Sequence, residues 1–88
     1  MRHLEFIAAK ARQETLEEAW RRAGARMAEF PRGRMGLTPD EVKATPEWRE
    51  ARATYDSAFA SLRTFSGAFN KYFAAELRAE RRKKRAPV

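Results

Sequence analysis

Apolar residues recur at helical spacing along the first third of the chain. They lie three or four positions apart, which places their side chains on one face of an α-helix. The set comprises Phe6, Ala9, Leu16, Trp20, Ala23, Met27 and Phe30, with Gln13 as the only polar member. The pattern predicts a helix over about residues 4–30. Thr15 to Glu18 has the form of a capping box, so we expect a short interruption near Gln13–Thr15.

A break and two helix starts follow. Two prolines and two glycines fall between residues 31 and 39, and proline cannot continue a helix, so this stretch is predicted to be a loop. Thr38-Pro39 and Thr45-Pro46 each pair a favoured N-cap residue with a favoured first helical residue. We therefore expect a single turn over 39–44 and a long helix over about 46–80, with a mild kink at Ser66-Gly67.

The long helix carries an apolar stripe that is rich in aromatic residues. At about 35 residues the helix would be roughly 50 Å long, which exceeds the first helix and leaves part of the stripe uncovered. The sequence thus predicts an all-α fold, a helical hairpin with a long C-terminal amphipathic helix that a second copy completes as a four-helix dimer. The expected interface residues are Trp48, Tyr55, Phe59, Phe65, Phe69, Tyr72, Phe73 and Leu77.

Composition adds that the positive charge is concentrated at the C-terminus. The chain of 88 residues has 19 Lys+Arg against 12 Asp+Glu, a formal net charge of +7. Residues 78–88 hold six cations and one glutamate, which gives +5 and leaves the rest nearly balanced. We therefore divide the chain into a single helical domain, residues 1–77, and a basic tail, residues 78–88. Cations at five successive positions surround a helix axis, so the tail is expected to be solvated or bound to something anionic.

The residues that most catalytic and metal sites need are scarce. The chain has no cysteine and one histidine, His3 near the N-terminus. No metal-ligand spacing, catalytic triad or phosphate-binding glycine loop is present, so we expect neither an enzyme nor a metal or cofactor site. No apolar run reaches the length of a membrane span, and the first residues lack a signal-peptide pattern. These features favour a cytoplasmic protein, and the Ala- and Arg-rich usage is typical of bacterial or phage genes.

The basic tail points to nucleic acid. Cationic side chains neutralise backbone phosphates and release counterions, so we expect binding to DNA or RNA that weakens steeply with salt. Sequence-specific recognition is not expected, because the chain shows no recognition-helix pattern. The candidate residues are Arg78, Arg81, Arg82, Lys83, Lys84 and Arg85 in the tail, with Arg32 and Arg34 in the loop as auxiliary contacts.

A protein target is the alternative partner. On this hypothesis the aromatic face docks on a larger protein or nucleoprotein complex, as an inhibitor or adaptor of the kind that phages and mobile elements encode. Exposure of Tyr72, Phe73 and Leu77 in a monomer would favour it over nucleic-acid binding. Binding to a membrane surface is less favoured, because the cations follow the apolar stripe rather than flank it.

Overall fold

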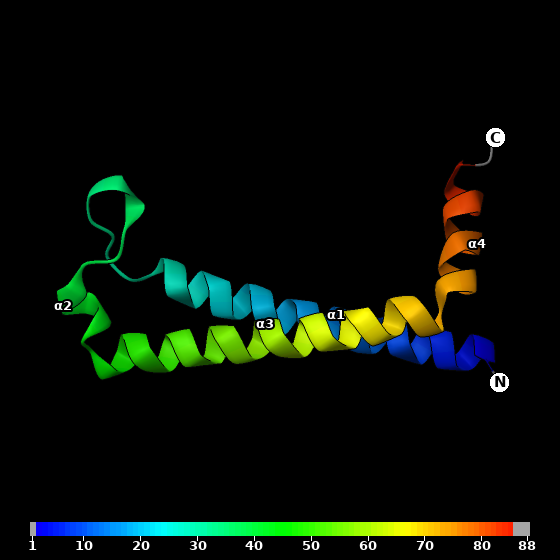
Figure 1. Ribbon diagram of the computed structural model, residues 1–88, viewed down its shortest axis with the longest axis horizontal. Helices are drawn as coiled ribbons and strands as arrows, with labels where there is room; N and C mark the ends of the chain where they lie inside the picture. The colour runs from blue at the N-terminus through cyan, green and yellow to red at the C-terminus, as the bar shows by residue number, and fades with distance from the viewer. Residues whose placement is uncertain (1, 86–88) are drawn as a thin grey trace.

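The computed structural model describes residues 2–85, and this part of the chain is all-α, as predicted from the sequence. Its elements are α1 (Arg2–Ala28), a short 3-10 turn η1 (Arg34–Gly36), α2 (Asp40–Lys43), α3 (Pro46–Tyr72) and α4 (Ala74–Arg85). α1 and α3 pack side by side in opposite directions as a rod, and α4 turns steeply away from it at the end where α1 begins (Figure 1). No strand occurs between residues 2 and 85, and no helix there is both long and apolar enough to cross a bilayer.

The core is a thin seam between α1 and α3. At the end near α4, Phe6 contacts Phe69 and Phe73, with ring centroids 5.9 and 5.3 Å apart. Toward the loop the seam continues through Trp20, whose ring lies 5.8 Å from that of Phe59, and ends at Ala23 and Ala51. These aromatic contacts and the apolar area they remove from water stabilise the pair.

Gln13, the one polar residue of the first apolar stripe, has a partner in the seam. Its Nε2 donates a hydrogen bond to Ser66 Oγ, 3.0 Å away. Thr15 does not cap a helix start, because its hydroxyl donates to the carbonyl of Ala11 one turn earlier. α1 therefore runs without a break through the place where we expected an interruption, because the polar side chains are satisfied within or across the helix pair.

The long C-terminal helix ends earlier than its apolar pattern predicts. α3 passes through Ser66-Gly67 without a break and stops at Tyr72, and Phe73 leaves the helical region with φ −106° and ψ 28°. The predicted helix over 46–80 is therefore two helices, and the second continues to Arg85. α1 and α3 have 27 residues each, so the expected length mismatch, which left aromatic residues uncovered, does not exist.

The two predicted helix starts after the loop behave differently. α3 begins at Pro46, and the backbone N–H of Trp48 donates to Thr45 Oγ1 at 3.3 Å, the expected N-cap. α2 begins one residue later than predicted, at Asp40, and has no side-chain cap. The loop before it is closed by a 2.7 Å hydrogen bond from Gly33 N–H to the Leu37 carbonyl. Met35 and Gly36 both have positive φ there, which glycine adopts freely and methionine does not.

The described chain is extended and only one layer thick. Its extents are 52 × 29 × 16 Å and its Cα radius of gyration is 18.1 Å, against about 12 Å for a compact domain of this length. Its accessible surface is 7225 Å², against about 5300 Å² expected for a compact monomer of this mass. Only five apolar residues of the described part of the chain are buried, so a single chain has little core there.

Two helical glycines are expected to be replaceable with a gain in stability. A Cβ at Gly24 would meet Tyr55 Cε2 at 3.6 Å, an ordinary contact, and a Cβ at Gly67 would meet nothing within 4 Å. Since glycine inside a helix costs up to about 1 kcal/mol relative to alanine, Gly24→Ala and Gly67→Ala should each raise the free energy of unfolding by about 0.5–1 kcal/mol. Urea unfolding followed by circular dichroism measures both, and a loss of stability for Gly24→Ala alone would mean that α1 and α3 approach more closely than described.

Candidate nucleic-acid interface

The turn at Phe73 is held by contacts with the start of α1. The guanidinium of Arg2 donates to the carbonyl of Tyr72, an acceptor at the C-terminal end of α3. Leu77, one turn into α4, packs against the cluster of Phe6, Phe69 and Phe73. The direction of α4 is therefore fixed by the packing of Leu77 on this cluster and by the contact of Arg2 with the C-terminal end of α3.

The two glutamates of α4 pair with cations of α1. Arg2 Nε lies 3.1 Å from the carboxylate of Glu76, and Lys10 Nζ lies 2.7 Å from that of Glu80. The hydrogen bond from Lys10 lowers the pKa of Glu80, and the hydrogen bond to Glu76 raises the pKa of Arg2. These acids interrupt the apolar stripe of the sequence, and the structure explains them as the side of α4 that is tied to α1.

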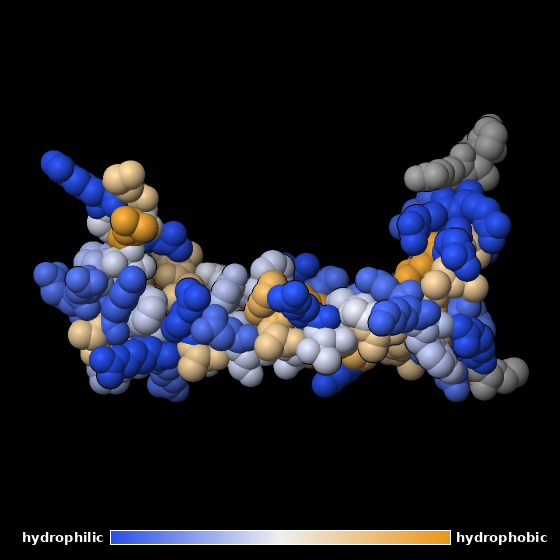
Figure 2. Space-filling model, in the orientation of Figure 1, coloured by the Kyte–Doolittle hydropathy of each residue, from blue (hydrophilic) through white to orange (hydrophobic). Residues whose placement is uncertain are grey.

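The cations of α4 remain exposed. Arg78, Arg81, Arg82, Lys83 and Lys84 are exposed, and none forms an ion pair within residues 2–85. Figure 2 shows hydrophilic side chains gathered around the part of this helix that stands away from the rod, with apolar side chains at its base. Because both acids of α4 are already neutralised, the field around the helix is that of five clustered positive charges.

Arg2 and Lys10 are contributors to this arrangement that sequence reasoning missed. Each is one basic residue on an otherwise mixed helix, about 70 positions before its partner in the chain. A faint signal was available in the sequence: the row Arg2, Phe6 and Lys10 shares one side of α1 at four-residue spacing. The contacts of Arg2 with Glu76 and of Lys10 with Glu80 depend on the turn at Phe73, and no residue type near Phe73 predicts a turn.

The structure does not bring the two predicted basic segments together. Arg32 and Arg34 are exposed on the loop, and the loop lies at the opposite end of the rod from α4 (Figure 1). α4 as described ends at Arg85, whose side chain lies outside the described part of the chain, as do residues 86–88. The described interface is therefore the group of five α4 cations, without the loop arginines.

Most of the predicted aromatic interface is used inside the chain. Phe69 and Phe73 are buried in the core. Four others are half-buried along the seam or beside it: Trp48, Tyr55, Phe65 and Leu77. Phe59 and Tyr72 stay 43% and 56% exposed. α1 covers most of the stripe because it is as long as α3, so only part of the predicted interface is accessible to a partner.

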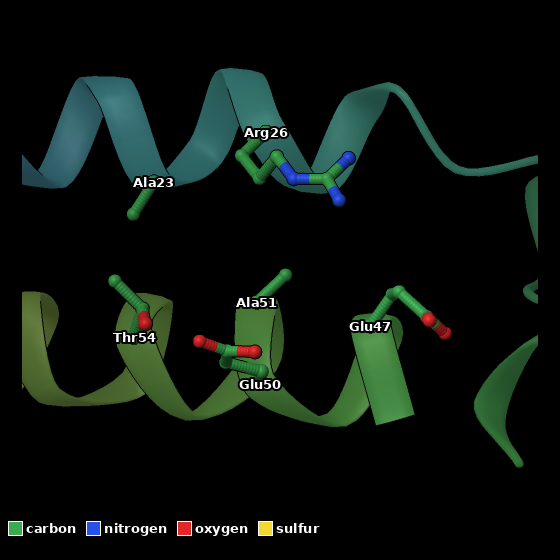
Figure 3. A pocket seen from close by; sticks show the side chains of 6 residues that line it. All are labelled: Ala23, Arg26, Glu47, Glu50, Ala51 and Thr54. Atoms are coloured by element: carbon green, nitrogen blue, oxygen red, sulfur yellow. The ribbon is translucent and has the colours of Figure 1, made fainter. Parts of the chain in front are cut away.

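Three hollows share one side of the seam between α1 and α3, and a further hollow of about 300 Å³ lies between Gly24, Trp48 and the loop. Of the three, the one nearest the loop, about 260 Å³, is framed by Ala23 and Ala51, with Arg26 on one wall and Glu47 and Glu50 on the other (Figure 3). A second, about 580 Å³, follows near Leu16 and Ser61. The third, about 420 Å³, is lined mainly by apolar side chains, including Phe65 and Tyr72. Within residues 2–85 no three histidine, aspartate or glutamate side chains gather closely enough to hold a metal ion.

The ion pair of Glu80 gives α4 a pH dependence. The pKa of Glu80 is lowered in the folded chain, so the pair stabilises α4 at neutral pH and this contribution disappears as the pH falls through that pKa. At pH 7, Glu80→Gln should speed the amide hydrogen exchange of α4 by about two- to fivefold, as expected for one exposed pair. Near pH 3 the variant and the original chain should exchange alike. A difference that persists at pH 3 would mean that the pair does not hold α4.

Comparison with known proteins offers no relative from which a function can be transferred. No protein-family model, curated protein or solved structure matches this chain. The case for a function therefore depends on the geometry of α4 and of the helix pair.

Proposed function

We propose that this chain is a small non-catalytic protein that binds the phosphate backbone of nucleic acid through α4. The observation that carries the proposal is the excess of positive charge on this helix. Glu76 and Glu80 are paired with α1, while five exposed cations of α4 form no ion pair in the described chain. Phosphates are the polyanions that such a cluster fits best.

The expected binding is electrostatic and independent of base sequence. The exposed polar residues of α4 are arginine and lysine rather than a mixed polar set that reads base edges. Five phosphate contacts predict that the logarithm of the binding constant falls with the logarithm of salt concentration with a slope of about −4 to −5 on duplex DNA. The test is a fluorescence-anisotropy titration of labelled duplex at several salt concentrations, and lack of binding at low salt would overturn the proposal.

We also propose that the working form is a dimer, a helical hairpin completed by a second copy. A single layer of two helices leaves one or both of its faces open, whereas stable domains pack at least two layers around a core. The accessible area of 7225 Å² exceeds the compact expectation by about 1900 Å². A standard interface needs only about 800 Å² from each partner.

Docking on a larger protein is the less favoured candidate. Of the three residues whose exposure would favour it, Tyr72 is exposed, Phe73 is buried and Leu77 is half-buried. Most of the aromatic face is thus covered within the chain itself and cannot contact another protein. The five exposed cations of α4, in contrast, form no ion pair in the described chain and contribute there only by interacting with the C-terminal end of the helix dipole.

A further inference from the structure

The three hollows belong to one continuous face of the helix pair. Their lining residues on α1 include Glu5, Ala9, Leu16 and Ala23, and those on α3 include Thr54, Ser61, Thr64 and Ala68. Within each helix these positions are three, four or seven residues apart, so they share one side. We call this side the back face, and it is defined by these eight residues.

The back face is free of the rest of the chain. α4 is tied to Arg2, Phe6 and Lys10, a row displaced by one residue, or about 100° around α1, from Glu5 and Ala9. None of the residues that line the three hollows belongs to α4 or to the loop. The basic helix and the back face therefore do not obstruct one another.

The α3 side of the back face carries no charge between Thr54 and Ala68, in a chain where 35% of residues are charged. On the α1 side, Arg12 lines the middle hollow. The α3 row runs Thr54, Ser57, Ser61, Thr64 and Ala68, all exposed and all small. Small side chains let a second helix approach to about 8 Å. A helix of 27 residues is about 40 Å long, and two helices side by side are about 20 Å wide. The face therefore offers about 800 Å², which is the area that a standard interface takes from each partner.

We infer that a second copy of this chain docks on the back face in the antiparallel direction, with α3 stacked on α3 and α1 on α1. The inference deepens the proposed dimer by naming its surface and direction. Parallel pairing would place two α4 helices, each with five exposed cations, at the same end of the assembly. Antiparallel pairing places them at opposite ends, and because like charges repel, it is the favoured arrangement.

The residue positions agree with this arrangement. Within one chain, Gln13 lies opposite Ser66 and Gly24 lies opposite Tyr55, which sets the register of α1 against α3. In this register the level midway between Glu5 and Arg26 on α1 is the level of Thr64 on α3. A two-fold axis at this level brings Glu5 of one copy to the level of Arg26 of the other.

Single cysteines test the inference, because the chain has none of its own. Thr64→Cys lies at the predicted axis, so the two copies should form a disulfide under mild oxidation. Thr54→Cys lies ten residues away, which separates the two thiols by about 30 Å, beyond the reach of about 7 Å between Cα atoms that a disulfide allows. Asn70→Cys, on the opposite side of α3, is the control for the other face. Only Thr64→Cys should give a covalent dimer on a non-reducing gel.

Sedimentation of the unmodified chain separates failure of this inference from failure of the proposed dimer and of nucleic-acid binding. A monomer mass at all concentrations would overturn the dimer and the docking together. A dimer that links through Asn70→Cys, or fails to link through Thr64→Cys, would overturn only the face and direction. A charge on the back face, Ala68→Glu, should raise the dimer dissociation constant at least about 100-fold, while Asn70→Glu should leave it unchanged. An equal effect of both would also overturn the face, and in every case duplex binding is measured independently.

Discussion

Replacing the four cations that end α4 with glutamine should lower the affinity for duplex DNA about 1000-fold at 0.1 M salt. The substituted residues are Arg81, Arg82, Lys83 and Lys84, all exposed and without ion pairs in the described chain. Each phosphate contact contributes about −0.9 to the slope of log affinity against log salt, so the slope should fall from about −4 to −5 to about −1. Glutamine keeps the helix-forming tendency of the segment, so the change tests charge rather than structure.

The matched control removes the same charge elsewhere. It replaces four exposed cations on α1, α2 and α3 with glutamine: Arg21, Lys43, Arg49 and Arg63. Its net charge equals that of the α4 variant, so non-specific attraction is lowered equally in both. We expect the control to keep most of the salt slope of the original chain. Equal losses in the two variants would show that net charge, and not α4, determines binding.

Phe6→Ala should destabilise the chain by about 3–4 kcal/mol, as expected for removal of a buried aromatic side chain. Phe6 is 5% exposed and contacts Phe69 and Phe73. It also belongs to the cluster on which Leu77 packs, so its loss weakens the anchor of α4. Small domains are stable by only about 5–15 kcal/mol in total, and this chain has a thin core. Urea unfolding followed by circular dichroism at fixed protein concentration measures the effect.

The neighbouring position supplies the control for the core substitution. Ile7 lies one residue along α1 and is 51% exposed, so Ile7→Ala should cost less than about 1 kcal/mol. Phe6→Leu, which keeps much of the apolar volume, should fall between the two alanine variants. Similar losses for Phe6→Ala and Ile7→Ala would contradict the described seam.

The all-α class and the start of α3 could be predicted because their causes are local. Thr45 and Pro46 stand next to each other in the chain, and their capping chemistry acts within one turn. Apolar spacing likewise reports which side of α1 and α3 is covered. In these segments, local preference and tertiary packing agree.

The end of α3 at Tyr72 could not be predicted, because its causes are distant in the chain. No proline or glycine marks Phe73. The turn is stabilised by Leu77 on the Phe6 cluster and by Arg2 on the Tyr72 carbonyl. The Arg2 contact joins residues 70 positions apart. The spacing of apolar residues carries no information about such a contact, so it predicted a helix that runs through the turn. The same cause hid the role of Glu76 and Glu80, which looked like misplaced polar residues.

The outward direction of α4 sets what the proposed dimer would do to its ligand. α4 turns away from the rod (Figure 1) and is tied to Arg2 and Lys10 of α1, which do not belong to the back face. In an antiparallel pair the two basic helices would stand at far ends of the assembly and point away from each other. One straight duplex cannot follow both, so the dimer would tether two separate strands or duplex segments. Such a dimer would gather and condense nucleic acid rather than coat it.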